Sequence, residues 1–155
     1  MNEIRTARIE DLQVIESIVY AAYAPYSERI GRKPAPMSDD YAALIRDGAV
    51  SVLIVQGDVA GMIVLEDKID HILVCNVAVA PKCQGQGLGK MLLAYAESHA
   101  RTRNINQLRL YTNEKMHENL AIYEKLGWHE YNRVAQDGFC RVFMQKTIYT
   151  NGPSF

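Results

Sequence analysis

The stretch between residues 72 and 112 constrains the fold more than any other part of the chain. Residues 72–79 are an almost unbroken apolar run, which is typical of a strand buried on both faces in the middle of a sheet. From Leu88 the apolar positions recur every three or four residues, which predicts an amphipathic helix of about four turns. Residues 107–112 form a second strand. A strand, a helix and a strand in this order predict a right-handed crossover and parallel pairing.

Hairpins flank this crossover on both sides. The apolar runs 51–55 and 59–65 are joined by Gln-Gly-Asp, and residues 128–134 and 139–148 are joined by Gln-Asp-Gly, both typical turn compositions. Because hairpins require antiparallel pairs, the sheet cannot be an all-parallel doubly wound sheet. We therefore expect the α/β (α+β) class, with a mixed, mostly antiparallel central sheet of about seven strands and helices on both faces.

The remaining segments complete this pattern. Further periodic segments predict a strand at residues 3–7 and helices at residues 12–24, 39–47 and 118–126. The first of these helices is expected to stop at Pro25, because proline removes a helical hydrogen bond. Residues 25–36 contain several prolines and a glycine together with aromatic and apolar side chains, so they predict an ordered loop.

Length and charge limit the possible organisation. The chain has 155 residues, and 17 Lys and Arg against 18 Asp and Glu leave a formal net charge of −1. A chain of this size can bury one core but is short for two, so we expect a single domain over residues 1–150 and a C-terminal tail over residues 151–155. The balanced charge does not favour nucleic acid or an anionic membrane as the partner.

The cysteines and the N-terminus indicate the compartment. The three cysteines are odd in number and lack metal-like spacing, and the four histidines share no ligand spacing, so we expect neither a disulfide framework nor a metal site. The N-terminus lacks the apolar stretch of a secretory signal, and no apolar run reaches the roughly 18 residues of a membrane span. A cytoplasmic location is expected.

The segment Gln-Gly-Gln-Gly-Leu-Gly-Lys at residues 84–90 joins the apolar strand to the long helix. Glycines permit positive φ angles and let a ligand approach the main chain, while the first helical turn adds unpaired N–H donors, so a phosphate is the natural ligand. A dinucleotide fingerprint would need glycine where Lys90 stands. A Walker A loop would need glycine at Gln84 and Ser or Thr at Met91. A nucleotide-binding enzyme is therefore disfavoured.

Gln84, Gly87 and Gly89 match the Q/R-x-x-G-x-G/A signature of the GCN5-related N-acetyltransferases, the GNAT family, which this chain resembles. A second match lies at residues 119–128, which read N-x-A-x-Y-x-x-x-G-W and resemble the Asn, Tyr and Gly-Phe region of that family, with Trp128 in place of Phe. The predicted order of strands and helices also resembles the GNAT-like acyl-CoA N-acyltransferase fold.

The resemblance implies that acetyl-CoA is the acetyl donor and that no metal takes part. It implies that the pantetheine arm lies along Val77 and Val79 and that Asn119 and Tyr123 stand at the thioester end. The residues implied to hold the pyrophosphate through their amides are Gln84, Gly85, Gln86, Gly87, Leu88, Gly89 and Lys90. Related enzymes often dimerise, but the sequence shows no exposed patch, so the oligomeric state stays open between a monomer and a homodimer.

The resemblance implies that Tyr123 is the general acid that protonates the departing coenzyme A thiolate. The base is less specified, because the position where some family members carry a glutamate is Tyr111 here. Glu66, Asp67 and His71 flank the central strands and are candidate bases acting through water, and Glu114, which follows the fifth strand, is a further candidate. An amine that arrives already neutral would need none of them.

The resemblance places the acceptor near residues 25–41. Tyr26, Arg29, Arg32, Met37 and Tyr41 are the candidate acceptor-binding residues, the arginines for a carboxylate or phosphate and Met37 with Tyr41 for an apolar wall. A solvated charged turn remains the alternative. The function expected is acetyl transfer from acetyl-CoA to a primary amine of a small molecule or protein by direct attack in a ternary complex. A non-catalytic acyl-CoA-binding regulatory module is the alternative.

Overall fold

The computed structural model of the chain describes residues 2–136 and 138–149. The chain divides into two compact units, the first comprising Met1–Leu65 and Cys75–Tyr95, the second Glu66–Val74 and Ala96–Phe155. The expected single domain over residues 1–150 stays a prediction, and the expected tail over residues 151–155 lies outside the described residues.

Within residues 2–136 and 138–149, seven strands and four α-helices follow one another in the expected order. The strands are β1 (Asn2–Thr6), β2 (Val50–Val55), β3 (Asp58–Asp67), β4 (Ile72–Val79), β5 (Gln107–Asn113), β6 (His129–Gln136) and β7 (Phe139–Thr147). The α-helices are α1 (Leu12–Ile30), α2 (Tyr41–Arg46), α3 (Leu88–Thr102) and α4 (His117–Lys125), with 3-10 turns η1 (Ile9–Asp11), η2 (Ala35–Ser38) and η3 (Pro81–Cys83).

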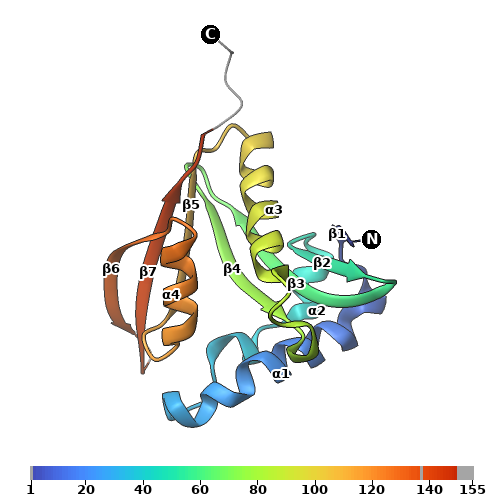
Figure 1. Cartoon of the computed structure of the whole chain (residues 1–155), viewed down its shortest axis with the longest axis horizontal. Coiled ribbons are helices and arrows are strands. Elements are labelled where there is room, and N and C mark those ends of the chain that lie inside the picture. The colour runs from blue at the N-terminus through green and yellow to red at the C-terminus, as the bar shows by residue number, and fades with distance from the viewer. Residues whose placement is uncertain (1, 137, 150–155) are drawn as a thin grey trace. The chain divides into compact units, whose positions relative to one another are not determined.

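The strands form one seven-stranded sheet in the hydrogen-bonding order β1-β2-β3-β4-β5-β7-β6 (Figure 1). β4 and β5 pair in parallel, as the crossover predicts. The pairs β1–β2, β2–β3, β5–β7 and β6–β7 are antiparallel. The expected mixed, mostly antiparallel sheet with helices is therefore confirmed.

In the first unit the hairpin between β2 and β3 has the predicted tight turn. Val55 pairs with Asp58, and the two residues between them, Gln56 and Gly57, have φ angles of 52° and 85°. Positive φ at both central positions is the geometry of a type I′ turn, which matches the twist of the flanking strands.

Helix α1 does not stop at Pro25, so that prediction was wrong. The helix continues to Ile30 and ends at Gly31, which has a φ of 87° and whose N–H donates to the Ser27 carbonyl. The buried side chains of this helix, Ile15, Ile18, Val19 and Tyr23, all precede the proline, and residues 24–30 are half-buried or exposed. Apolar burial therefore does not account for the extra turns; a proline in a helix interior can kink the helix instead of ending it. The loop expected over residues 25–36 begins only after the helix.

Strand β4 also differs from expectation, because its burial alternates instead of being complete on both faces. Asn76 and Ala78 are buried, whereas Val77 and Val79 are half-buried. Burial on both faces occurs instead in β2 and β3. An apolar run cannot distinguish a covered face from an accessible one, because much accessible protein surface is itself apolar.

In the second unit, α4 lies beside the β5, β7 and β6 strands (Figure 1). Trp128, directly after this helix, is 1% exposed and packs with Tyr123 at a ring-centroid distance of 6.0 Å. Lys146 on β7 donates to Glu97 on α3 at 3.0 Å. The packing of Trp128 on Tyr123 fixes the end of α4 that carries Tyr123, and the Lys146–Glu97 pair joins β7 to α3.

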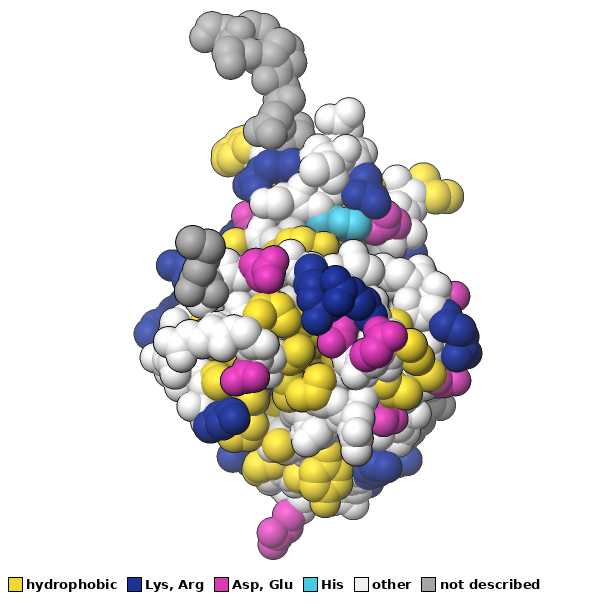
Figure 2. Space-filling model, turned by 90° about the vertical axis from the view of Figure 1, so that its right-hand side faces the viewer, with side chains coloured by type: hydrophobic (Ala, Val, Ile, Leu, Met, Phe, Trp, Pro, Cys, Tyr) yellow, Lys and Arg dark blue, Asp and Glu magenta, His cyan; other side chains and the backbone are white. Residues whose placement is uncertain are grey.

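The surface drawn in Figure 2 carries basic and acidic side chains interspersed with exposed apolar ones, without a continuous basic stripe. That face therefore gives no sign of a polyanion as its partner. Within residues 2–136 and 138–149, no helix combines the length and apolar character that crossing a membrane requires.

Candidate active site

The glycine segment at residues 84–90 lies largely at the surface, and Leu88 is its one buried residue. Leu88, the first residue of α3, is 3% exposed and belongs to the core, whereas the side chains of Gln84, Gln86 and Lys90 face solvent. Gln84 Nε2 donates to the Val79 carbonyl at 3.3 Å, which ties the segment to the end of β4. Leu88 can therefore offer a ligand only its main chain.

The main-chain amides of this segment are unpaired. The N–H of Cys83 and Gln84 donate to Ala80 and Pro81, and helical bonding resumes when Met91 N–H donates to the Gly87 carbonyl at 3.2 Å. Among the described residues, no group accepts from the N–H groups of residues 85–90. Consecutive free donors at the N-terminus of a 15-residue helix favour a bound anion.

Glycine is required at two positions of the segment. Gly85 and Gly87 have φ angles of 83° and 77°, where other residues are strained. A Cβ built at Gly85, Gly87 or Gly89 would meet no atom within 4 Å, so the space above the amides is open. These residues fit a diphosphate group.

A fourth glycine, which sequence reasoning missed, sets the position of α3 within the first unit. A Cβ at Gly61 on β3 would lie 3.0 Å from the Ala78 carbonyl oxygen and 3.1 Å from Leu92 Cδ1. Only glycine therefore lets β3, β4 and α3 approach this closely. An isolated glycine inside a strand pattern is the signal that could have revealed it.

The expected acceptor residues of the first unit lie on two helices and the segment between them. Tyr26 and Arg29 are on α1, with the guanidinium 5.0 Å from the Tyr26 ring centroid. Arg32 is exposed after the helix end, and Met37 is half-buried in η2. Tyr41 is expected to form part of an apolar wall. Its side chain is only 3% exposed, so it belongs to the core under this region.

A buried polar network that the sequence did not reveal joins α1, α2 and β4. The Tyr23 hydroxyl donates to Asn76 Oδ1 at 2.6 Å, and Asn76 Nδ2 donates to the Tyr41 oxygen at 2.9 Å. The Tyr41 hydroxyl donates to the Pro36 carbonyl at 2.5 Å. Burial, with the nearby Asp39 carboxylate, raises the pKa of Tyr41, so its phenol stays neutral. A lone asparagine within an apolar strand was the available signal.

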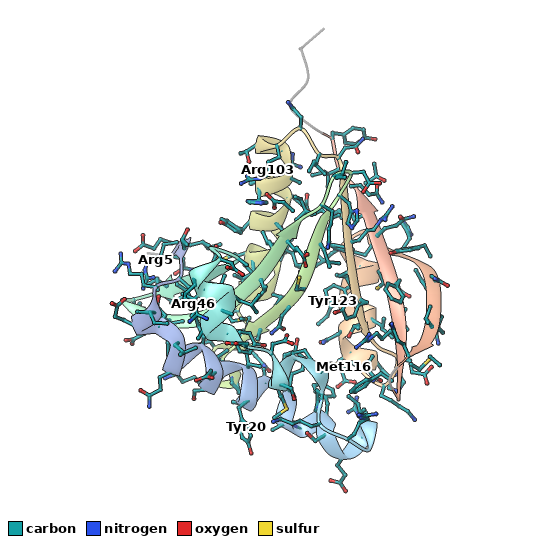
Figure 3. All side chains as sticks on the ribbon, turned by 180° about the vertical axis from the view of Figure 1, so that it is seen from behind. Arg5, Tyr20, Arg46, Arg103, Met116 and Tyr123 are labelled. Atoms are coloured by element: carbon teal, nitrogen blue, oxygen red, sulfur yellow. The ribbon has the colours of Figure 1, made fainter. Side chains whose placement is uncertain are left out.

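In the second unit, Asn119 and Tyr123 lie one turn apart on α4, as their spacing predicts. Tyr123 is 8% exposed, and burial raises the pKa of its phenol to about 12. No described residue forms a hydrogen bond with its hydroxyl. Figure 3 labels Tyr123 together with Met116, the buried N-cap residue of the same helix. Asn119 is only half-buried.

The candidate bases lie on either side of the turn between β3 and β4, Glu66 near the end of β3 and His71 directly before β4. Lys68 N–H donates to the His71 carbonyl at 2.9 Å, closing the turn. Glu66 accepts from Lys68 Nζ at 2.6 Å, and His71 Nδ1 lies 2.7 Å from Asp70 Oδ1. The His71 hydrogen bond lowers the pKa of Asp70, so that carboxylate is ionised at neutral pH and can orient the imidazole. Both candidate bases thus have a partner at this turn.

A family model, the acetyltransferase (GNAT) family, matches residues 15–128. The chain belongs to this family. It is therefore an acetyltransferase of the class that the loop and the Asn119–Trp128 segment resemble. A comparison with curated protein sequences gives no match.

Solved structures share the fold along almost the whole chain. The ribosomal-protein-S18-alanine N-acetyltransferase from Escherichia coli is 25% identical with a TM-score of 0.72, covering 100% of this chain and 99% of that chain. PaiA N-acetyltransferase from Thermoplasma acidophilum, in complex with coenzyme A, is 18% identical with a TM-score of 0.74 over 95% and 99%. A GNAT family acetyltransferase from Elizabethkingia anophelis with acetyl-CoA bound is 15% identical with a TM-score of 0.73 over 95% and 98%.

In the part of the chain that is described, no group of three or more His, Cys, Asp or Glu side chains could hold a metal ion. The three cysteines all lie in that part, and each is a free thiol.

Proposed function

We propose that this GNAT acetyltransferase transfers the acetyl group of acetyl-CoA to a primary amine of a small molecule or protein, by direct attack in a ternary complex. The observation that carries the proposal is the row of unpaired N–H groups at residues 85–90, at the positive end of α3. Acetyl-CoA supplies an activated thioester and a diphosphate that these donors can bind. Exposed Lys82 and Lys90 add positive charge on either side.

Tyr123 is the proposed general acid. A coenzyme A thiol with a cysteine-like pKa of about 8.5 leaves as a thiolate whose protonation at pH 7 is worth roughly 2 kcal/mol. Because burial raises the pKa of the Tyr123 phenol to about 12, the proton is present throughout the neutral range. Its hydroxyl is not committed to any described residue, so it can be offered to the departing sulfur.

Glu66 and His71 are the proposed bases. An amine with a lysine-like pKa of about 10.4 costs roughly 4.6 kcal/mol to deprotonate at pH 7, so proton removal matters more than thiolate protonation. His71 Nδ1 lies 2.7 Å from Asp70 Oδ1, which orients the imidazole and leaves Nε2 to accept a proton. The pH profiles of kcat/KM for His71→Gln and Glu66→Gln distinguish them, since only loss of the true base removes the acidic limb.

The acceptor is proposed to carry an anionic group near its amine. Arg29 and Arg32 could pair with a carboxylate or phosphate, and Met37 could contact its apolar part. Replacing both arginines with glutamine should raise the acceptor KM. An unchanged KM for an identified acceptor would contradict this assignment.

The decisive experiment combines binding and turnover. Calorimetry with coenzyme A tests the loop, and thiol release on adding a panel of amines, with mass spectrometry of the product, tests transfer. Binding without turnover across the panel would instead favour the non-catalytic acyl-CoA-binding module. The free cysteines support the cytoplasm as the proposed location. Gel filtration with light scattering decides whether the chain forms a homodimer.

A further inference from the structure

We infer that Asn76 is a positioning residue. It fixes the position of residues 34–41, the acceptor segment, relative to β4, the strand expected to carry the pantetheine arm. The inference rests on the proposed function, because it names how the acceptor side of that site is placed. Asn76 belongs to β4, and the acceptor segment contains η2 and the first residue of α2.

The hydrogen bonds run in one direction through three side chains. Tyr23 donates to the Asn76 oxygen, the Asn76 amide donates to Tyr41, and Tyr41 donates to the Pro36 main-chain carbonyl. Asn76 is 5% exposed, and the two phenols are also buried. The series of hydrogen bonds ends on the main chain of the acceptor segment, at the Pro36 carbonyl.

An apolar residue would be the simpler choice at this position. Val74 and Ala78, two residues away on either side along β4, are both buried and apolar. A buried amide gains little net stability from its hydrogen bonds and is costly whenever one is left unmade. Unlike apolar packing, however, hydrogen bonds are directional, so they specify where the Pro36 carbonyl lies. Positioning therefore explains the asparagine better than stability does.

The network reaches both sides of the proposed site. On the donor side, the Tyr23 hydroxyl also lies 3.4 Å from the carbonyl of Val77, the half-buried residue expected to face the pantetheine arm. On the acceptor side, Pro36 precedes Met37, whose own N–H donates to the Pro34 carbonyl at 3.1 Å. A shift of about 1 Å between two reacting groups can slow a reaction by about 100-fold. The hydrogen bonds that hold the acceptor segment at a fixed position on β4 limit such a shift.

Tyr41→Phe is the informative variant, because it removes the hydroxyl that links Asn76 to Pro36 and keeps the buried ring. We expect the acceptor KM to rise at least fivefold, with the acetyl-CoA KM and the coenzyme A affinity unchanged within twofold. Amide hydrogen exchange at Met37 and Ser38 should also become faster. The matched control is Tyr95→Phe, which removes a hydroxyl bonded to Ser51 at 3.1 Å in the same unit, and it should change none of these values.

A triple variant separates positioning from stability. Tyr23→Phe, Tyr41→Phe and Asn76→Leu together replace all three side chains of the network by apolar groups, so the melting temperature should recover relative to Tyr41→Phe alone. The acceptor KM should stay high, because the directional link is still missing. Recovery of the KM together with the melting temperature would show that the network only stabilises the fold.

The results distinguish failure of this inference from failure of the proposed function. If an acceptor is found and Tyr41→Phe leaves its KM unchanged, the inference is overturned while the proposed function stands. If no amine is acetylated, the proposed function fails, and the exchange experiment alone decides. Faster exchange at Met37 and Ser38 in Tyr41→Phe, but not in Tyr95→Phe, supports the link, and unchanged exchange overturns it.

Discussion

Gly87→Ala separates the binding role of the glycine segment from its structural role. Gly87 has a φ of 77°, and a Cβ there would meet no atom within 4 Å, so the new methyl group causes backbone strain but no clash. A non-glycine residue in the left-handed region is strained by about 1–2 kcal/mol. Because the segment is exposed, the free protein can relax, and binding must then restore the strained conformation. We expect coenzyme A to bind roughly 5- to 30-fold more weakly.

Two other glycines provide the controls. Gly57, at a φ of 85° in the β2–β3 turn, also has open space around its Cβ, so Gly57→Ala should lower the melting temperature and leave coenzyme A affinity unchanged. Gly89 lies inside α3 without a positive φ, so Gly89→Ala should stabilise the helix by up to about 1 kcal/mol and keep binding. Calorimetry and thermal unfolding measure both effects. Equal coenzyme A affinity in Gly87→Ala and the unmodified protein would refute the reasoning.

Three further changes test other parts of the molecule. Tyr123→Phe should lower kcat by up to about 30-fold at pH 7 with unchanged coenzyme A affinity, and full turnover would remove the proposed acid. Trp128→Phe should cost less than about 1.5 kcal/mol in urea unfolding, because its buried Nε1 has no partner in the described chain. A loss above about 3 kcal/mol would mean that the indole N–H is satisfied. The hydrogen bond from Arg5 lowers the pKa of Asp11 below its ordinary value of 3.8. The ion pair therefore stabilises the fold fully above about pH 4, and this stabilisation is lost as the pH falls through the lowered pKa. Asp11→Asn should therefore flatten the acid limb of the melting temperature, and an unchanged limb would contradict the assignment.

Local patterns predicted most of the fold. The turn at Gln56 and Gly57 and the end of α3 near Asn104, which has a φ of 56°, each depend on a few neighbouring residues. Pro25 misled the prediction because a proline in a helix interior can kink the helix instead of ending it, and here α1 continues to Ile30. The helix ends instead where Gly31 adopts a positive φ.

In the candidate site, local features were predictable and distant contacts were not. The open main chain at Gly85 and Gly87, next to the start of α3, follows from glycine spacing, so the sequence could suggest the proposed anion site. The network at Asn76 could not be predicted, because its partners Tyr23 and Tyr41 are 53 and 35 residues away along the chain. The sequence gives the weakest signal for the proposed bases Glu66 and His71, since charged residues beside turns are common on any protein surface.

The two most buried candidate phenols show why burial alone does not identify a proton donor. Burial raises the pKa of both Tyr41 and Tyr123, so each is neutral at physiological pH. The Tyr41 proton is already donated to the Pro36 carbonyl, and its oxygen accepts from Asn76, so transferring the proton would break a buried network. The Tyr123 hydroxyl has no such partner among the described residues, and giving up its proton breaks no hydrogen bond to them. Tyr41→Phe should therefore act on acceptor KM, whereas Tyr123→Phe should act on kcat.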